Sequence, residues 1–233
     1  MYVLVACEES QEVCKAFRAL GHTAYSCDIQ ECSGGHPEWH IQDDCFNPIQ
    51  RGSFETQDGV FHMVFGNWDL IIAHPPCTHL AVSGARWFKE KQADGRQQAA
   101  IDFFMRFTEL KVKHLCIENP ISIMSTYYRK PDQIIQPYQF GHPVKKATCL
   151  WLKGLPLLKP TDIVEPGDTD EYGFTIGSHL QMARDENGKI IAWNDKRTAI
   201  LRSKTFPGIA KAMADQWGNK SDLLYFCQYG GKA

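Results

Sequence analysis

Apolar residues near the N-terminus form short continuous runs that alternate with a one-sided helical pattern. The run Tyr2 to Cys7 is apolar and β-branched without a helical period, which predicts a buried strand. From Gln11 to Leu20 the apolar positions fall on one helical face, and Gly21 stands where a helix C-terminus favours glycine. Thr23 to Cys27 then predicts a second strand that ends at Asp28. Because a helix connects the two strands, we expect them to be parallel.

The same alternation continues further along the chain. Additional strands are predicted at Trp68 to Ala73 and at His114 to Glu118, with a long helix from about Gln97 to Leu110 between them. This order predicts an α/β fold with an open, mostly parallel sheet and helices on both faces. Ligands bind beyond the carboxyl ends of the strands in such sheets. Polar or reactive residues follow the predicted strands at Glu8 and Glu9, Asp28, His74 to Cys77, and Glu118 to Pro120.

The C-terminal part of the chain is less regular. Gly, Pro and charged residues dominate from Pro156 to Gly177, and Asn187-Gly188 between two apolar runs predicts a hairpin with a two-residue turn. We therefore expect a small irregular lobe in this region. A final helix is predicted from about Pro207 to Trp217, with proline in its first turn and Gly218 at its end.

Composition narrows the class of protein. The chain has 233 residues, of which 43% are hydrophobic and 22% charged, as expected for one sizeable globular domain. Nine cysteines without regular spacing indicate reduced thiols and a cytoplasmic protein. No apolar run approaches the ~20 residues of a membrane span, and the N-terminus has no basic leader, so we expect neither membrane insertion nor export.

The formal net charge is only −2, so any contact with nucleic acid requires a local basic patch. Between Arg129 and Pro160, six Lys or Arg residues stand against Asp132 alone. A second basic cluster comprises Lys196, Arg197, Arg202 and Lys204. Such clusters can bind phosphates, although charged loops are more often simply solvated.

The segment Asp-Leu-Ile-Ile-Ala-His-Pro-Pro-Cys-Thr, from Asp69 to Thr78, carries the strongest chemical signal. Two prolines directly after a buried strand fix a stiff extended turn and present Cys77 at the sheet edge. Most free cysteines are buried packing residues, but this presentation favours a nucleophile. Zinc-dependent cytidine deaminases also carry Pro-Cys, but they need a second cysteine three residues on, where this chain has Leu80. A Rossmann-like dehydrogenase is disfavoured because no Gly-x-Gly-x-x-Gly follows the first strand.

Further segments accompany Pro-Pro-Cys in a fixed order. They are Ser83-Gly84, Asp94-Gly-Arg96, Leu115-Cys-Ile-Glu118-Asn119-Pro120, Phe140-Gly141-His-Pro143-Val-Lys-Lys146-Ala-Thr148, and Arg202-Ser-Lys-Thr-Phe-Pro207-Gly208-Ile-Ala210. In this order they resemble the motifs of the DNA (cytosine-5) methyltransferases, most closely the compact phage and prophage forms. Two motifs depart from the family: Gln-x-Arg-x-Arg becomes Val144-x-Lys146-x-Thr148, and the glycine-rich first motif becomes Val5-Ala-Cys-Glu8-Glu9-Ser10.

The resemblance implies a Rossmann-like methyltransferase fold, S-adenosylmethionine as cofactor and DNA as partner. In the family a thiolate adds to C6 of a flipped-out cytosine, and C5 then attacks the cofactor's methyl group. A free thiol has a pKa of about 8.5, so it needs activation or a matching protonation of the base. By resemblance Cys77 is the nucleophile, Glu118 the partner of ring atom N3, and Asn119 a residue that holds the strand end.

The resemblance also implies two further sets of residues. Asp28 ends the second strand, where doubly wound folds bind a ribose, and Asp44 takes the family's position near the adenine. The expected cofactor residues are Cys7, Glu8, Glu9, Asp28, Asp44 and Pro75. The expected substrate or DNA residues are Ser83, Arg86, Lys145, Lys146, Arg202 and Lys204.

The motifs assign 1–154 and 202–233 to a catalytic core and 155–201 to a small target-recognition lobe. Because this lobe is much smaller than is usual in the family, the same chemistry on a free cytosine nucleotide or on single-stranded nucleic acid is an alternative. The missing glycines and arginines leave a third alternative, a catalytically silent relative that binds DNA or a partner. No metal site is expected, because glycines and Pro37 argue against a helical zinc pair at His36 and His40.

Overall fold

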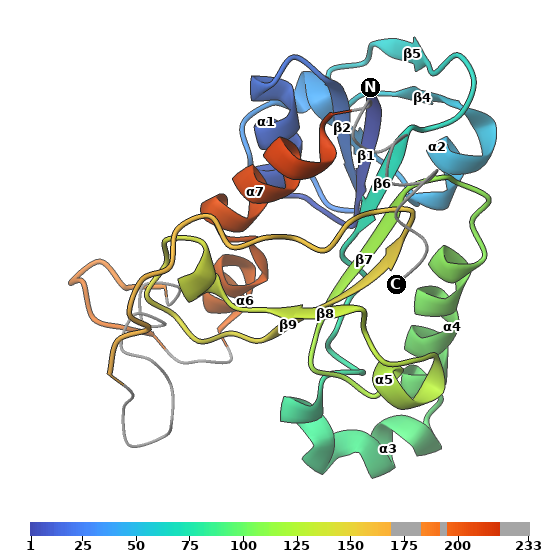
Figure 1. Cartoon of the computed structure of the whole chain (residues 1–233). Helices are drawn as coiled ribbons and strands as arrows, with labels where there is room; N and C mark the ends of the chain where they lie inside the picture. The colour runs from blue at the N-terminus through green and yellow to red at the C-terminus, as the bar shows by residue number, and fades with distance from the viewer. Residues whose placement is uncertain (169–182, 192–194, 220–233) are drawn as a thin grey trace.

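The computed structural model describes residues 1–168, 183–191 and 195–219 (Figure 1). The strands are β1 (Tyr2–Ala6), β2 (Thr23–Asp28), β3 (His40–Gln42), β4 (Ser53–Glu55), β5 (Phe61–Met63), β6 (Leu70–Ala73), β7 (Leu115–Pro120), β8 (Gln133–Ile135) and β9 (Thr148–Lys153). The α-helices are α1 (Glu12–Ala19), α2 (Phe46–Arg51), α3 (Phe88–Ala93), α4 (Arg96–Thr108), α5 (Met124–Tyr127), α6 (Lys196–Ser203) and α7 (Pro207–Trp217). Short 3-10 helices are η1 (Pro37–Trp39), η2 (Val82–Trp87) and η3 (Pro137–Gln139).

A seven-stranded sheet forms the centre of the molecule, with the order β3-β2-β1-β6-β7-β9-β8. The strands from β3 to β7 are paired in parallel, whereas β9 runs antiparallel to both of its neighbours, β7 and β8. The first five strands thus follow the Rossmann order, and one reversed strand lies near the far edge. The mostly parallel, Rossmann-like sheet that the sequence predicts is confirmed. Strands β4 and β5 form a separate antiparallel pair.

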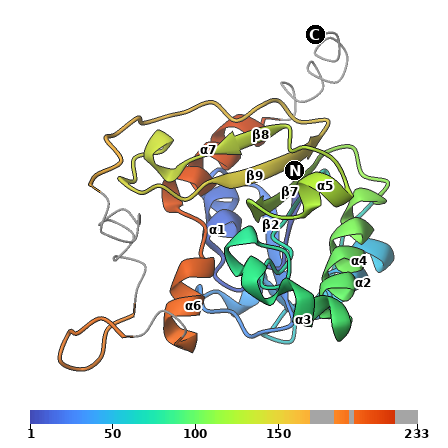
Figure 2. The same cartoon turned by 90° about the horizontal axis from the view of Figure 1, so that it is seen from below.

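Helices cover both faces of this sheet. Helices α1 and α7 lie together on one face and α4 lies on the other, as Figures 1 and 2 show. On the first face, Phe17 of α1 and Trp217 of α7 are fully buried. On the second face, Phe104 and Phe107 of α4 are fully buried. Burial of each such ring stabilises the fold by roughly 1.5–3 kcal/mol. Because helices cover the sheet on both faces, the strands are apolar on both sides.

The hairpin prediction requires a correction. A bridge pairs Arg184 with Ile190, but the loop has three residues and not two, because the Asp185 N–H donates to the Lys189 carbonyl at 2.9 Å. The Gly188 N–H donates to the Asp185 carbonyl at 3.0 Å, and Gly188 has φ 78°. A tight turn followed by a left-handed glycine makes a bulged loop. Parts of both predicted flanking runs, residues 181–182 and 192–193, lie outside the described residues.

The segment after β9 is attached to the core. Leu155 and Leu158 are buried in the cluster beneath α1 and α7, and the Trp217 indole donates to the Pro156 carbonyl at 3.1 Å. The beginning of the predicted lobe is therefore held by the last helix.

Each of the eight cysteines in the described ranges is a free thiol. None of the described helices is both long and apolar enough to span a membrane.

Candidate active site

Two loops meet at the carboxyl ends of the neighbouring strands β6 and β7. The buried side-chain amide of Asn119 donates to the Pro75 carbonyl at 2.7 Å. The loops are joined again further on, where the Ile123 N–H donates to the Leu80 carbonyl at 3.1 Å. These bonds hold the Pro-Pro-Cys turn against the end of β7. The predicted nucleophile Cys77, in the loop after β6, and the predicted base partner Glu118, near the end of β7, therefore lie at one edge of the sheet.

The turn that carries Cys77 is supported from two helices. The N–H groups of Leu80 and Ala81 both donate to the Cys77 carbonyl at 2.9 Å, which closes the turn. The buried ammonium of Lys91 in α3 donates to the Thr78 carbonyl at 2.7 Å. In addition, the Gln97 amide in α4 donates to the His79 carbonyl at 3.2 Å. The stiffness predicted from the two prolines is thus reinforced by side chains from elsewhere in the chain.

Opposing charges act on the Cys77 thiol. Burial and the carboxylate of Glu118 raise the pKa of Cys77, whereas the cations of Lys146 and Arg202 lower it, and the net direction is upward. The thiol of the ligand-free protein is therefore protonated near neutral pH. The Lys146 ammonium donates to the Arg202 carbonyl at 2.6 Å, which fixes it beside α6, and burial lowers its own pKa. Two of the predicted DNA-binding residues thus share the electrostatic environment of the cysteine.

The other predicted substrate residues lie on more accessible segments. Ser83 and Arg86 are exposed on η2, beside the half-exposed ring of Trp87. Lys145 is exposed and Lys204 is partly buried. The structure therefore brings Lys146 and Arg202 to the cysteine and leaves the other four nearer to solvent.

Not every basic residue of the first cluster remains available for phosphates. The Arg129 guanidinium pairs with Asp132 at 2.7 Å, and the Lys153 ammonium donates to the Leu110 carbonyl at 2.9 Å. Both side chains therefore have partners within the protein.

The loop between β1 and α1 replaces a glycine-rich motif. Cys7 has φ 59° and Gln11 has φ 61°, the left-handed conformation that glycine usually supplies. The Gln11 side chain donates to the His36 carbonyl at 2.9 Å and accepts from the His36 N–H at 3.1 Å. A Cβ on Gly34 would overlap Gln11, so only glycine fits against this loop. The loop thus keeps a glycine-type geometry and is held by the segment after β2.

Glu8 has a structural position at this loop. Its buried carboxylate accepts the N–H of Val13 at 2.7 Å and the N–H of Cys14 at 3.2 Å, in the first turn of α1. Burial raises the pKa of Glu8, although the charge of His74 and the two N–H groups act in the opposite direction. The carboxylate thus occupies the helix N-terminus, where an anion is favoured. No sequence pattern distinguishes this use of Glu8 from a contact with a ligand.

The remaining predicted cofactor residues surround the ends of β1, β2 and β3. Asp28 is partly exposed at the end of β2 and accepts the Gln30 N–H at 2.9 Å. Asp44 is exposed and accepts the Phe46 N–H at 2.9 Å, at the start of α2. Glu9 accepts the Ser33 hydroxyl at 2.5 Å, and the Cys7 sulfur lies 3.9 Å from that of Cys45. Pro75 is buried beneath the active turn.

Sequence reasoning gives His74 no role of its own, although it precedes the two prolines. Its Nδ1 lies 2.9 Å from Oε2 of Glu118, with exposed side-chain fractions of 12% for His74 and 21% for Glu118. Its Nε2 is buried without a hydrogen-bond partner. Forty-four positions separate the two residues, so only the parallel pairing of β6 and β7 brings them together.

His36, between β2 and β3, and His40, the first residue of β3, have partners within the protein. Buried His40 lies 2.9 Å from the Ser26 hydroxyl and 2.8 Å from the Gln30 carbonyl, and the His36 ring stacks on Trp39 at 3.7 Å. Within the described ranges, no group of three or more His, Cys, Asp or Glu residues is arranged to hold a metal ion.

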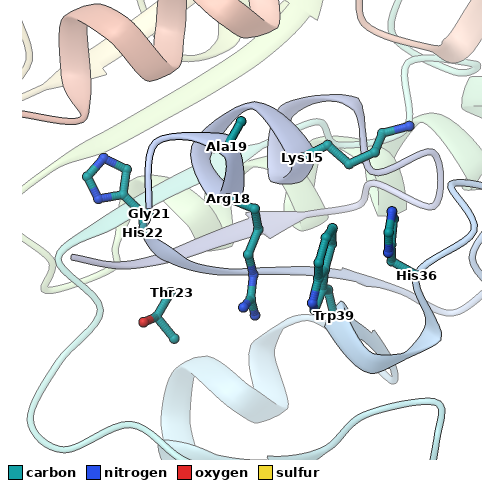
Figure 3. A pocket seen from close by; sticks show the side chains of 8 residues that line it. All are labelled: Lys15, Arg18, Ala19, Gly21, His22, Thr23, His36 and Trp39. Atoms are coloured by element: carbon teal, nitrogen blue, oxygen red, sulfur yellow. The ribbon is translucent and has the colours of Figure 1, made fainter.

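A separate open pocket of about 620 Å³ lies beside α1 and the amino end of β2 (Figure 3). It is lined by Lys15, Arg18, Ala19, Gly21, His22, Thr23, His36 and Trp39. It does not include the cysteine turn. Because β2 begins at Thr23, the pocket is at the opposite end of this strand from Asp28.

Neither the family models nor the curated proteins compared with the sequence include a match. A solved structure, that of a proposed DNA modification methyltransferase encoded within a prophage of E. coli, is similar, with 16% sequence identity and a TM-score of 0.43. The similarity covers 79% of this chain and 56% of that chain, so the present chain spans just over half the length of that protein.

Proposed function

We propose that the protein transfers a methyl group from S-adenosylmethionine to C5 of cytosine in DNA, with Cys77 as the nucleophile that adds to C6. The observation that supports this is that Cys77 and Glu118 lie at the carboxyl ends of two adjacent parallel strands, where the Asn119 amide binds the Pro75 carbonyl. This edge carries a thiol for C6 and a carboxyl group for ring atom N3. Cytosine inside a duplex cannot reach such an edge, so the base has to be flipped out.

The charges around Cys77 fit this order of events. Glu118 as a carboxylate raises the pKa of the thiol, while Lys146 and Arg202 lower it. When Glu118 carries a proton toward N3, its negative charge no longer opposes ionisation of the thiol, and the two cations remain. Binding of the base therefore favours the thiolate at the moment when C6 is in reach. When no base is bound the thiol stays protonated, and a protonated thiol is oxidised less readily than a thiolate.

The residues at the ends of β1 and β2 fit S-adenosylmethionine. The partly exposed carboxylate of Asp28 stands at a strand end, where it can accept bonds from ribose hydroxyls. The left-handed residues Cys7 and Gln11 keep the loop tight without glycine. Both oxygens of Glu8 already accept backbone N–H groups, so this residue holds the loop and helix α1 in position. When bound, the cofactor supplies an electrophilic methyl group.

DNA as the substrate is supported by the groups around the cysteine. Lys146 and Arg202 place positive charge beside the cysteine, which favours a flipped nucleotide with its phosphates. Trp87, with 49% of its surface exposed, and Tyr127, with 55%, are available to stack on bases or fill the vacated space. Trp87 is the last residue of η2, after β6, and Tyr127 is the last residue of α5, after β7.

The test is transfer of a labelled methyl group from S-adenosylmethionine to duplex DNA, single-stranded DNA and deoxycytidine triphosphate. We expect transfer to duplex cytosine, loss of transfer in Cys77→Ala, and a decrease of about 10²–10⁴-fold in Glu118→Gln. Cys32→Ala, a partly buried cysteine outside this edge, is the matched control and should stay active. Full activity of Cys77→Ala, or methylation of a base other than cytosine, would overturn the proposal. A preference for the free nucleotide would overturn its DNA part alone.

A further inference from the structure

His74, which directly precedes Pro-Pro-Cys, contacts the predicted base partner Glu118. It directly follows β6, and its own N–H donates to the Ala6 carbonyl at 2.9 Å, which anchors it between β1 and β6. From this fixed position Nδ1 meets Oε2 of Glu118 at 2.9 Å. One oxygen of the Glu118 carboxyl is therefore occupied by the imidazole. The other, Oε1, is the oxygen left for a bound base.

Carboxylates from two sides act on His74. Glu118 contacts it from β7, and Glu8 acts on it from the loop between β1 and α1. Burial alone lowers the pKa of His74, but the hydrogen bond and charge of Glu118, together with the charge of Glu8, raise it above the usual value. Cys77 and Lys146 act in turn on the Glu118 side of the pair. The orphaned Nε2 is a second donor position when the ring is protonated.

We propose that His74 is the positioning and charge-compensating residue of Glu118, and that it makes the reaction dependent on pH. This inference rests on the proposed function. The bond to His74 orients the carboxyl group so that Oε1 faces N3 of cytosine. The imidazolium stabilises the carboxylate that remains after Oε1 has lost its proton.

The step is balanced as follows. When the base binds, the Cys77 thiol releases its proton and Oε1 of Glu118 takes one up, so the number of protons on the two groups is unchanged. The Cys77 thiolate then forms a bond to C6, the electrons of the C5–C6 double bond move through C4 to N3, and N3 takes the proton from Oε1 of Glu118. This leaves C5 as the carbon of an enamine and Glu118 as an anion paired with His74. After methyl transfer, solvent water takes the proton from C5, the bond between sulfur and C6 breaks with its electron pair on the sulfur, and the N3 proton returns to Oε1. His74 keeps its protons throughout, which distinguishes it from a general acid.

The pH dependence follows from the sign of the shift. Because the pKa of His74 lies above its usual value, the imidazolium persists to higher pH than that of an ordinary histidine and is lost as pH rises through that pKa. The thiol acts in the opposite direction, since it ionises as pH rises. We therefore expect a bell-shaped profile of kcat/KM, in which His74 sets the alkaline limb.

The test pairs a titration with kinetics. Asparagine places a neutral amide donor near the position of Nδ1, so His74→Asn keeps a bond to Glu118 and removes the charge. We expect kcat to fall about 10–100-fold, because a charge-assisted hydrogen bond becomes a neutral one or is lost. KM should change little, and the alkaline limb of the pH profile should disappear. The same substitution at His36, whose side chain pairs with Glu38 outside this edge, is the control. An unchanged kcat and profile in His74→Asn would overturn the inference.

NMR titration of the imidazoles gives a second readout that requires no activity. In the wild type His74 should titrate above the usual value, and in Glu118→Gln its pKa should fall, because burial then dominates. Equal titration of His74 in both proteins would overturn the inference. If the pKa of His74 depends on Glu118 but the wild-type protein methylates no cytosine, the proposed function is overturned instead. Failure of the inference and failure of the proposed function are therefore distinguishable.

Discussion

Glu8 provides a sharp test of how the first loop is built, because its carboxylate satisfies two buried N–H groups at once. Glu8→Ala leaves the N–H of Val13 and of Cys14 without a partner, and both residues are fully buried. Each unsatisfied buried donor costs about 1–3 kcal/mol, and the helix N-terminus loses a favourable anion. Relief of the desolvation of the carboxylate offsets part of this. We expect the free energy of unfolding to fall by about 2–4 kcal/mol.

Urea unfolding followed by circular dichroism measures this change. Glu12→Ala is the matched control, because Glu12 is an acidic residue of the same helix turn and makes only a surface pair with Lys15 at 3.4 Å. It should cost at most about 0.5 kcal/mol. Equal stability of the two variants would refute the assignment of Glu8 as the cap of α1. Glu8→Gln adds a pH test: since the pKa of Glu8 is raised, the wild type loses stability as pH rises above 4.5 through that pKa, and the glutamine variant does not.

Three further predictions follow from single contacts. Lys146→Met should slow alkylation of Cys77 by iodoacetamide severalfold at pH 8, because the lysine cation lowers the thiol pKa, while exposed Lys145→Met should not; peptide mass spectrometry measures the rate. Gly208→Ala should cost about 1–3 kcal/mol in urea unfolding, because a Cβ there would overlap the Phe140 carbonyl, whereas a near-neutral effect would contradict this packing. The stability that His74 contributes relative to His74→Asn should be complete below pH 6.5 and decrease at higher pH, since its pKa is raised; a growing difference in unfolding free energy would contradict the shift.

The sequence predicts the elements whose patterns are local. Strand β1 is a continuous apolar run because both of its faces are covered, and α7 has its proline at the start and its glycine after the end. The reversal of β9 has no such local mark, because its direction depends on pairing with β7 and β8. The Asn187-Gly188 pattern predicts a loop of two residues. It does not reveal the third loop residue, because it does not show that the left-handed Gly188 forms a bulge.

Some residues of the candidate site are likewise predicted by local sequence patterns, and others are not. Cys77 follows one predicted strand and Glu118 ends the next, so their placement at one sheet edge follows from parallel pairing alone. The bond from His74 to Glu118 and the capping of α1 by Glu8 depend on side-chain direction and on left-handed backbone at Cys7 and Gln11. Neither residue type signals this conformation, because the sequence has no glycine in the loop. The sequence therefore predicts the position of the proposed reacting groups better than that of the residues that contact them.

The central claim is a covalent bond between Cys77 and cytosine, and trapping of that bond tests it most directly. Duplex DNA containing 5-fluorocytosine is incubated with the protein and S-adenosylmethionine, because fluorine at C5 cannot leave as a cation and the adduct persists after methyl transfer. We predict a denaturation-resistant complex whose peptide mass places the modified base on Cys77, and no complex with Cys77→Ala. Methylated cytosine formed without any adduct at Cys77 would contradict the account. So would a methyl group on the exocyclic amino nitrogen of cytosine.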